Sequence, residues 1–147
     1  MNYAAIKPFD IANGPGVRVS LFVSGCTHHC PGCFQPETWD FDYGEKFTFL
    51  TLQEIEYLLL PDYISGLTIL GGEPFEPENL DELAFDLELI KPFLDGKTVW
   101  AYSGYTYEEL LSRTGEVGKR TRRMLNHLDV LVDGPFIEAQ KDIGLVF

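Results

Sequence analysis

All three cysteines of the chain lie close together in the stretch SGCTHHCPGCFQ, residues 24–35. Three thiols cannot all pair into disulfides, and a chain without a secretion signal is a poor candidate for such bonds. Thiolates are instead favourable ligands for zinc and for iron–sulfur clusters. The spacing of Cys26, Cys30 and Cys33, written CxxxCxxC, therefore predicts a metal centre.

Zinc and iron–sulfur clusters make different demands on this loop. A structural zinc ion takes four protein ligands, and His28 or His29 could complete a Cys3His set. To bind the same ion as the cysteines, either histidine would have to bend back over a short ring, and the later sequence contains no ligand pair with zinc spacing. We expect His28 and His29 to lie on the surface of the loop. A [4Fe-4S] cluster normally takes four thiolates, so three would leave one iron open, as in catalytic metal centres. The cluster is the stronger hypothesis, and zinc stays as the alternative.

Four segments around this loop have the composition of β-strands. The first, VRVSLFV (residues 17–23), leads directly into the cysteines, and the others are GLTIL (66–70), KTVWAY (97–102) and DVLV (129–132). Between them, helices are expected from Thr51 to Leu60, through residues 80–90, after Thr106 and through residues 120–128. Thr51 with Glu54, and Thr106 with Glu109, form patterns typical of capping boxes.

The alternation of strands and helices predicts an α/β fold with a mostly parallel sheet. A complete eight-stranded (β/α) barrel needs about 250 residues, so 147 residues predict an open, partial barrel forming a single domain over residues 1–147. In such folds the functional loops gather at the carboxyl ends of the strands. The cysteine loop, GGEP (71–74), SGY (103–105) and DGP (133–135) all fall there.

Together, CxxxCxxC and GGEP resemble the radical S-adenosylmethionine superfamily, whose fold is a partial barrel of this type. The stretch from Asn13 to Trp39, with YSGY (102–105) and VLVDGPF (130–136), narrows the resemblance to glycyl-radical-enzyme activases, especially those of anaerobic ribonucleotide reductases. In this family, S-adenosylmethionine chelates the fourth iron. One departure is Gly32, which stands before the third cysteine where many members carry an aromatic residue.

The resemblance implies reductive cleavage of S-adenosylmethionine at a [4Fe-4S] cluster. The resulting 5'-deoxyadenosyl radical would then generate a glycyl radical on the large subunit of an anaerobic ribonucleoside-triphosphate reductase, with reduced flavodoxin or ferredoxin as electron donor. The implied cluster ligands, which are also the catalytic residues, are Cys26, Cys30 and Cys33. The implied cofactor-binding residues are Gly32, Phe34, Gly71, Gly72, Glu73, Ser103 and Asp133. Ser103 and Asp133 are also common turn residues, so a purely local role stays open for both.

Charge and hydropathy argue against several partners. With 23 acidic and 11 basic residues, the net charge of -12 would repel a nucleic acid backbone. KRTRR (119–123) is interpreted as a solvated helix face. No apolar run approaches membrane-spanning length, and no secretion signal is evident, so we expect a cytoplasmic protein. Two alternatives remain: another small radical enzyme, similar to a deazaguanine synthase, and a zinc-stabilised interaction module.

Overall fold

Six strands form one open sheet in the order β3-β1-β2-β4-β5-β6. The structure is a computed structural model, and it describes residues 1–142 and 144. The strands are β1 (Asn2–Asp10), β2 (Val17–Val23), β3 (Glu45–Lys46), β4 (Ile64–Gly71), β5 (Thr98–Tyr102) and β6 (Val130–Val132). β2, β4, β5 and β6 run parallel, whereas β1 is antiparallel to both β2 and β3. The predicted α/β fold with an open, mostly parallel sheet is confirmed.

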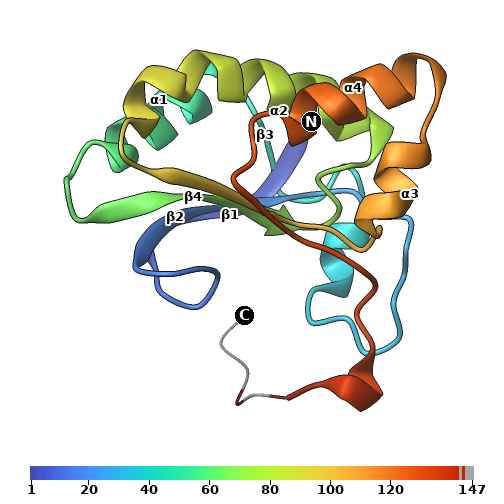
Figure 1. The fold of residues 1–147 in the computed structure, drawn as a ribbon. Coiled ribbons are helices and arrows are strands. Elements are labelled where there is room, and N and C mark those ends of the chain that lie inside the picture. Colours follow the sequence, from blue (N-terminus) through green and yellow to red (C-terminus); the bar gives the residue numbers. More distant parts are fainter. Residues whose placement is uncertain (143, 145–147) are drawn as a thin grey trace.

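The α-helices leave one face of the sheet to loops and short 3-10 helices. The α-helices are α1 (Phe49–Leu59), α2 (Pro77–Ile90), α3 (Tyr107–Ser112) and α4 (Gly115–Leu125). Short 3-10 turns lie at Pro36–Trp39, Lys91–Leu94 and Glu138–Gln140. Figure 1 shows α1, α2 and α4 above the sheet, with the β1–β2 loop, the cysteine segment and the segment after β6 below it. We call the lower side the helix-free face.

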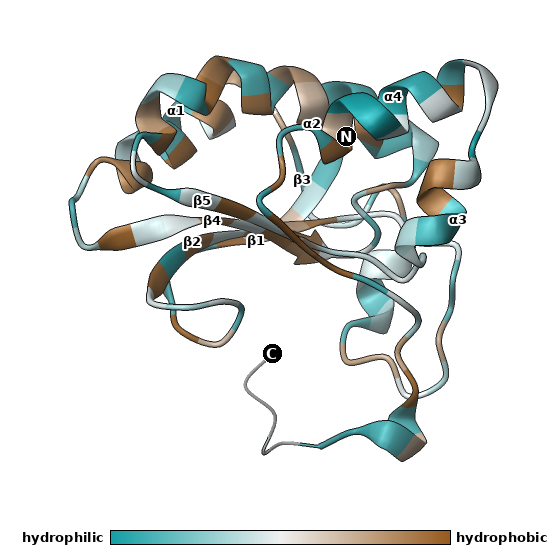
Figure 2. Ribbon diagram, viewed as in Figure 1, coloured by the Kyte–Doolittle hydropathy of each residue, from teal (hydrophilic) through white to brown (hydrophobic). Residues whose placement is uncertain are grey.

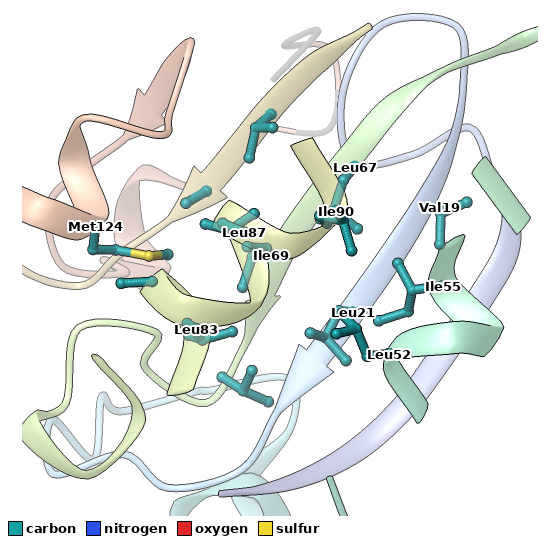
Figure 3. Close-up of a cluster of buried hydrophobic side chains, with 14 of the residues drawn as sticks. Val19, Leu21, Leu52, Ile55, Leu67, Ile69, Leu83, Leu87, Ile90 and Met124 are labelled. Carbon is teal, nitrogen blue, oxygen red and sulfur yellow. The ribbon is translucent and has the colours of Figure 1, made fainter. Parts of the chain in front are cut away.

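Side-chain alternation along the central strands builds the hydrophobic core. Val19 and Leu21 of β2 and Ile69 of β4 point toward the helices, where they meet α1 and α2 (Figure 3). Each fully buried aliphatic side chain of this kind contributes about 1.5–3 kcal/mol. The intervening residues, among them Arg18 and Thr68, are also buried, but on the helix-free face. β2 alternates between apolar and polar residues from Val17 to Leu21, but its polar residues Arg18 and Ser20 are buried as well, so both faces of this strand are covered.

Three local predictions need correction. The helix expected from Thr51 begins at Phe49 and ends at Leu59, and the capping residue is Thr48. Thr51 is the third residue of this helix, and its Oγ1 accepts a hydrogen bond from Thr48 N at 3.1 Å. The strand expected from residue 66 begins at Ile64, and strands β1 and β3 were not anticipated. In contrast, the Thr106–Glu109 capping box is confirmed: Thr106 N donates to Glu109 Oε2 at 2.7 Å.

The basic stretch in α4 is paired with acidic side chains, mostly on α2. Arg123 donates two hydrogen bonds to Glu88, each 2.8 Å long, and Arg120 lies 3.1 Å from Asp81. Exposed pairs of this kind contribute about 0–1 kcal/mol each. Figure 2 shows α4 as predominantly hydrophilic, in agreement with a solvated helix face. Among the described residues, no helix has both the length and the apolar character needed to cross a membrane.

Asp86 on α2 provides the first testable prediction. Burial, with added repulsion from Glu82, raises the pKa of Asp86 to about 7, and its Oδ2 has no hydrogen-bond partner among the described residues. The unfolded chain ionises this group near pH 4, so stability falls as pH rises from about 4 to about 7. We expect Asp86→Asn to stabilise the protein by about 1–2 kcal/mol above pH 7, a value reduced for solvent screening, and by less toward pH 4.

Denaturant unfolding of Asp86→Asn at several pH values, with the exposed Asp62→Asn as the matched control, measures this difference. An equal gain at pH 4 and pH 8 would contradict the role assigned to ionisation.

Candidate active site

The cysteine loop is closed at its neck by backbone hydrogen bonds. Gly25 N donates to Thr38 O at 2.8 Å, and Cys26 N donates to Trp39 O at 3.2 Å. Within the loop, Cys33 N donates to Cys30 O at 3.1 Å, and all three thiols are free. The strand β2 delivers the first cysteine, and these contacts hold the remainder of the loop at the carboxyl end of that strand.

The GGEP segment docks directly on this neck. Gly72 N donates to Val23 O, and Glu73 N donates to Gly25 O, both at 2.8 Å. A Cβ atom on Gly72 would lie 2.6 Å from the carbonyl oxygen of Gly25, and Gly71 has a φ of +105°, which side chains disfavour. The two glycines therefore let the ends of β2 and β4 approach each other. This contact accounts for them independently of any cofactor.

The carboxylate of Glu73 joins three segments and is fully buried. Its Oε1 accepts from Phe75 N and from Ser103 Oγ, each at 2.9 Å. Its Oε2 accepts from Gly104 N at 2.8 Å and from His28 Nε2 at 2.9 Å. Each oxygen thus receives two hydrogen bonds, which satisfies the carboxylate. Glu73 thereby fixes the loops that follow β2, β4 and β5 relative to one another.

The two histidines of the loop have different environments. His28 is mostly buried, and its ring packs against Tyr105 at 4.3 Å between centroids, so the prediction of a surface position is wrong for this residue. The hydrogen bond to Glu73 raises the pKa of His28 more than burial lowers it. His29 is exposed, as expected, and stacks on Trp39 with centroids 4.4 Å apart.

A second buried carboxylate secures the loop to the start of α2. Glu76 Oε1 accepts from both the backbone N and the Oγ1 of Thr27, each at 2.7 Å. Asn79 Nδ2 donates to Ser24 O at 3.0 Å and to Glu73 O at 3.1 Å. Neither Glu76 nor Asn79 was anticipated. In the sequence, only the position of Glu76, three residues after Glu73, could have indicated this contact. An acidic residue at this position is also common at the start of a helix, so it did not stand out.

One cavity of about 410 Å³ on the helix-free face brings the candidate residues together. Nine of the ten line it: Cys26, Cys30, Cys33, Phe34, Gly71, Gly72, Glu73, Ser103 and Asp133. Gly32 is not in the lining, and a Cβ atom there would lie 2.6 Å from the carboxylate of Glu138. Asp133 is exposed, and its Oδ2 accepts from Tyr107 N at 2.6 Å, a local contact of the kind left open for it.

Comparison with known proteins agrees with this arrangement. The family model of the 4Fe-4S single cluster domain matches residues 12–147. A protein of Haemophilus influenzae is 40% identical over 149 residues, which cover 100% of this chain and 92% of the relative. A protein of phage T4 is 38% identical to this chain, and the match covers 92% of the chain and 81% of the relative. A protein of Escherichia coli K12 is 36% identical, with 100% of the chain and 92% of the relative covered. All three relatives are named anaerobic ribonucleoside-triphosphate reductase-activating proteins. The chain belongs to this family.

The matching family model is that of a 4Fe-4S domain, so iron and sulfur, and not zinc, are expected at these thiols. Among residues 1–142 and 144, no three Cys, His, Asp or Glu side chains converge closely enough to hold one metal ion. Of the two histidines in the loop, His28 is bonded through Nε2 to Glu73, and His29 stacks its ring on Trp39. Burial, with repulsion from Glu73 and Glu76, raises the pKa of Cys26 to about 11, so metal binding must displace its proton.

The segment after β6 covers the outer side of the cysteine loop. Phe136 packs against Phe34, with ring centroids 5.1 Å apart, and Lys141 Nζ lies 4.5 Å from the centre of the Phe34 ring. Phe34 and Phe136 both line the cavity. Phe34 is nevertheless 68% exposed, so its ring forms an open apolar rim of the cavity.

Proposed function

We propose that this chain is one radical S-adenosylmethionine domain over residues 1–147 that generates a glycyl radical on the large subunit of an anaerobic ribonucleoside-triphosphate reductase. The observation that carries the proposal is the cavity in which all three thiols meet the GGEP and SGY segments. When bound, the [4Fe-4S] cluster and S-adenosylmethionine supply the electron transfer and the 5'-deoxyadenosyl radical. The chain's own residues have to bind, orient and enclose these groups.

We assign Cys26, Cys30 and Cys33 to the cluster, because they are free thiols in the lining of one cavity. Gly71 and Gly72 would offer backbone atoms to the amino group of S-adenosylmethionine. Glu73 would act mainly by orientation, since both of its oxygens already accept protein hydrogen bonds. The remaining proposed contacts to the adenosyl, ribose and carboxylate groups are Gly32, Phe34, Ser103 and Asp133.

A protein substrate fits the shape of this site. The cavity lies on the face that no α-helix covers, and the exposed Phe34 borders it. A small-molecule enzyme would require its substrate to be enclosed more fully, because buried sites bind small ligands best. We further propose a reduced flavodoxin or ferredoxin as electron donor and a cytoplasmic location.

Cysteine replacement tests the proposal. After anaerobic reconstitution with iron and sulfide, reduction and addition of S-adenosylmethionine, wild-type protein should form 5'-deoxyadenosine and place a glycyl radical on the reductase. Cys30→Ala should reduce both by at least about 1,000-fold, since the cluster loses a ligand. Ser112→Ala, on an exposed part of α3, is the control and should retain both. Chromatography measures the nucleoside, and electron paramagnetic resonance measures the radical.

Other outcomes would assign the chain differently. Nucleoside formation without any glycyl radical on the reductase would favour a radical enzyme that acts on a small molecule. A colourless protein holding one zinc ion, with intact S-adenosylmethionine, would instead indicate a zinc-stabilised interaction module. Either result would overturn the proposed function.

A further inference from the structure

Arg18 is an unusual feature of the helix-free face, because a charged side chain of this size is completely buried there. Its guanidinium donates to Thr68 Oγ1 at 2.8 Å, Thr98 Oγ1 at 3.0 Å, Leu67 O at 3.0 Å and Thr98 O at 2.7 Å. All four acceptors are neutral oxygen atoms. The guanidinium carbon also lies 5.5 Å from the centre of the Trp100 ring, a cation–π contact, but none of these partners carries an opposite charge. Burying a charge without an opposite charge in contact is costly, so a stabilising role alone explains this residue poorly.

The surrounding backbone makes room for this side chain. Gly66 lies between Arg18 and Thr98 in the sheet, and a Cβ atom on Gly66 would lie 2.8 Å from Arg18 Nη2. A Cβ atom on Gly14 would lie 2.6 Å from Arg18 Cδ. Arg18 therefore crosses from β2 toward β5 beneath Gly14 of the β1–β2 loop. This loop, residues 11–16, lies on the same side of the sheet as the cysteine segment (Figure 1).

Thr68 connects the buried guanidinium to that loop. Its Oγ1 accepts from Arg18 Nε and donates to the carbonyl oxygen of Asn13, each at 2.8 Å. Asp10 supports the loop from the other side, accepting from Ala12 N at 2.9 Å and from Asn13 Nδ2 at 2.7 Å. Asn13 also lines the cavity that contains the three cysteines. It reaches this cavity from the β1–β2 loop, and not from a loop at the carboxyl end of a parallel strand.

We propose that Arg18 and Thr68 are positioning residues that hold the β1–β2 loop against the sheet. Asn13 is thereby kept as one wall of the active-site cavity, where the glycine-bearing segment of the reductase is seated. The identity of that occupant rests on the proposed function. Fixing the loop before the partner arrives reduces the entropy lost on binding, which favours affinity for the reductase.

Thr68→Val and Thr68→Ser test this proposal. Valine has nearly the same volume but removes both hydrogen bonds of Oγ1, whereas serine keeps them. We expect Thr68→Val to raise the reductase concentration for half-maximal glycyl-radical formation about tenfold, with the limiting rate within about threefold of wild type, because the loss concerns binding. Thr68→Ser should behave like wild type. Arg18→Lys should resemble Thr68→Val, since an ammonium cannot reproduce the planar guanidinium contacts.

Hydrogen exchange of the chain alone separates this proposal from the proposed function. Amides of residues 11–16 should exchange at least about tenfold faster in Thr68→Val than in wild type and Thr68→Ser, while residues 49–59 of α1 should be unaffected. Unchanged exchange in the loop would overturn the positioning role, whatever the partner. Faster exchange with an unchanged half-saturating reductase concentration would overturn the link to binding. Failure of the wild-type protein to form any glycyl radical would instead count against the proposed function.

Discussion

Replacing Gly72 with alanine is expected to abolish assembly of the iron–sulfur cluster. The new Cβ atom would lie 2.6 Å from Gly25 O and 3.0 Å from Thr38 O, and both are backbone atoms at the neck of the cysteine loop. Relief requires the neck and the GGEP segment to separate, which breaks the hydrogen bond from Glu73 N to Gly25 O. Iron and sulfide content after anaerobic reconstitution should fall at least about tenfold, because a loop that is no longer preorganised binds metal poorly.

Gly96→Ala is the control for this substitution. Gly96 has a φ of +69°, and a Cβ atom added there would meet no other atom within 4 Å, so alanine introduces backbone strain without a clash. It should cost about 1 kcal/mol of stability and leave cluster content unchanged. Full cluster loading of Gly72→Ala would show that the contact between the two segments is dispensable.

Glu73→Gln is expected to lower the free energy of unfolding by about 2–4 kcal/mol and to weaken cluster retention. Each carboxylate oxygen accepts from one backbone N–H, of Phe75 or Gly104, and from one side chain. Whichever way the glutamine amide is turned, its NH2 group faces a backbone donor that cannot rotate away. The substitution therefore leaves buried donors unpaired even though the shape is conserved.

Denaturant unfolding measures the stability change, and the rate of loss of the cluster's visible absorbance measures retention. Glu78→Gln, in the exposed first turn of α2, removes the same charge without these contacts and serves as the control. If both variants have the same free energy of unfolding, the hydrogen bonds from Glu73 to the three loops do not stabilise the protein.

The sheet shows which elements local sequence can predict. The segments at 17–23, 66–70, 97–102 and 129–132 were recognised because they are apolar and β-branched, and each pairs in parallel as the alternation with helices requires. β1 was missed because Lys7 and Pro8 interrupt its apolar pattern, and its antiparallel pairing with the neighbouring strand β2 contains two register shifts. The start of α1 was misplaced because Thr48 and Thr51 are both plausible caps, and only the tertiary position of the chain selects one.

The sequence by itself determined the chemistry available to this protein. Three thiols in CxxxCxxC predict a metal centre and favour a [4Fe-4S] cluster over zinc, and the GGEP, SGY and DGP segments follow strands whose carboxyl ends must meet at one edge. These features are local in the chain, and their meaning depends on residue type and spacing alone.

Only the tertiary structure decided which hydrogen-bond partners each polar side chain of the site has. Glu73 bonds to residues 45 and 30 positions away, and Arg18 bonds to Thr98 across 80 positions. His28 is drawn inward by Glu73, and the position of Gly32 leaves room for the carboxylate of Glu138. Such pairings arise from the approach of distant strands, which periodicity and local propensity do not encode. For that reason the burial of Arg18 was not predicted, and Glu73, although part of the GGEP motif, received its hydrogen-bond partners only from the tertiary structure.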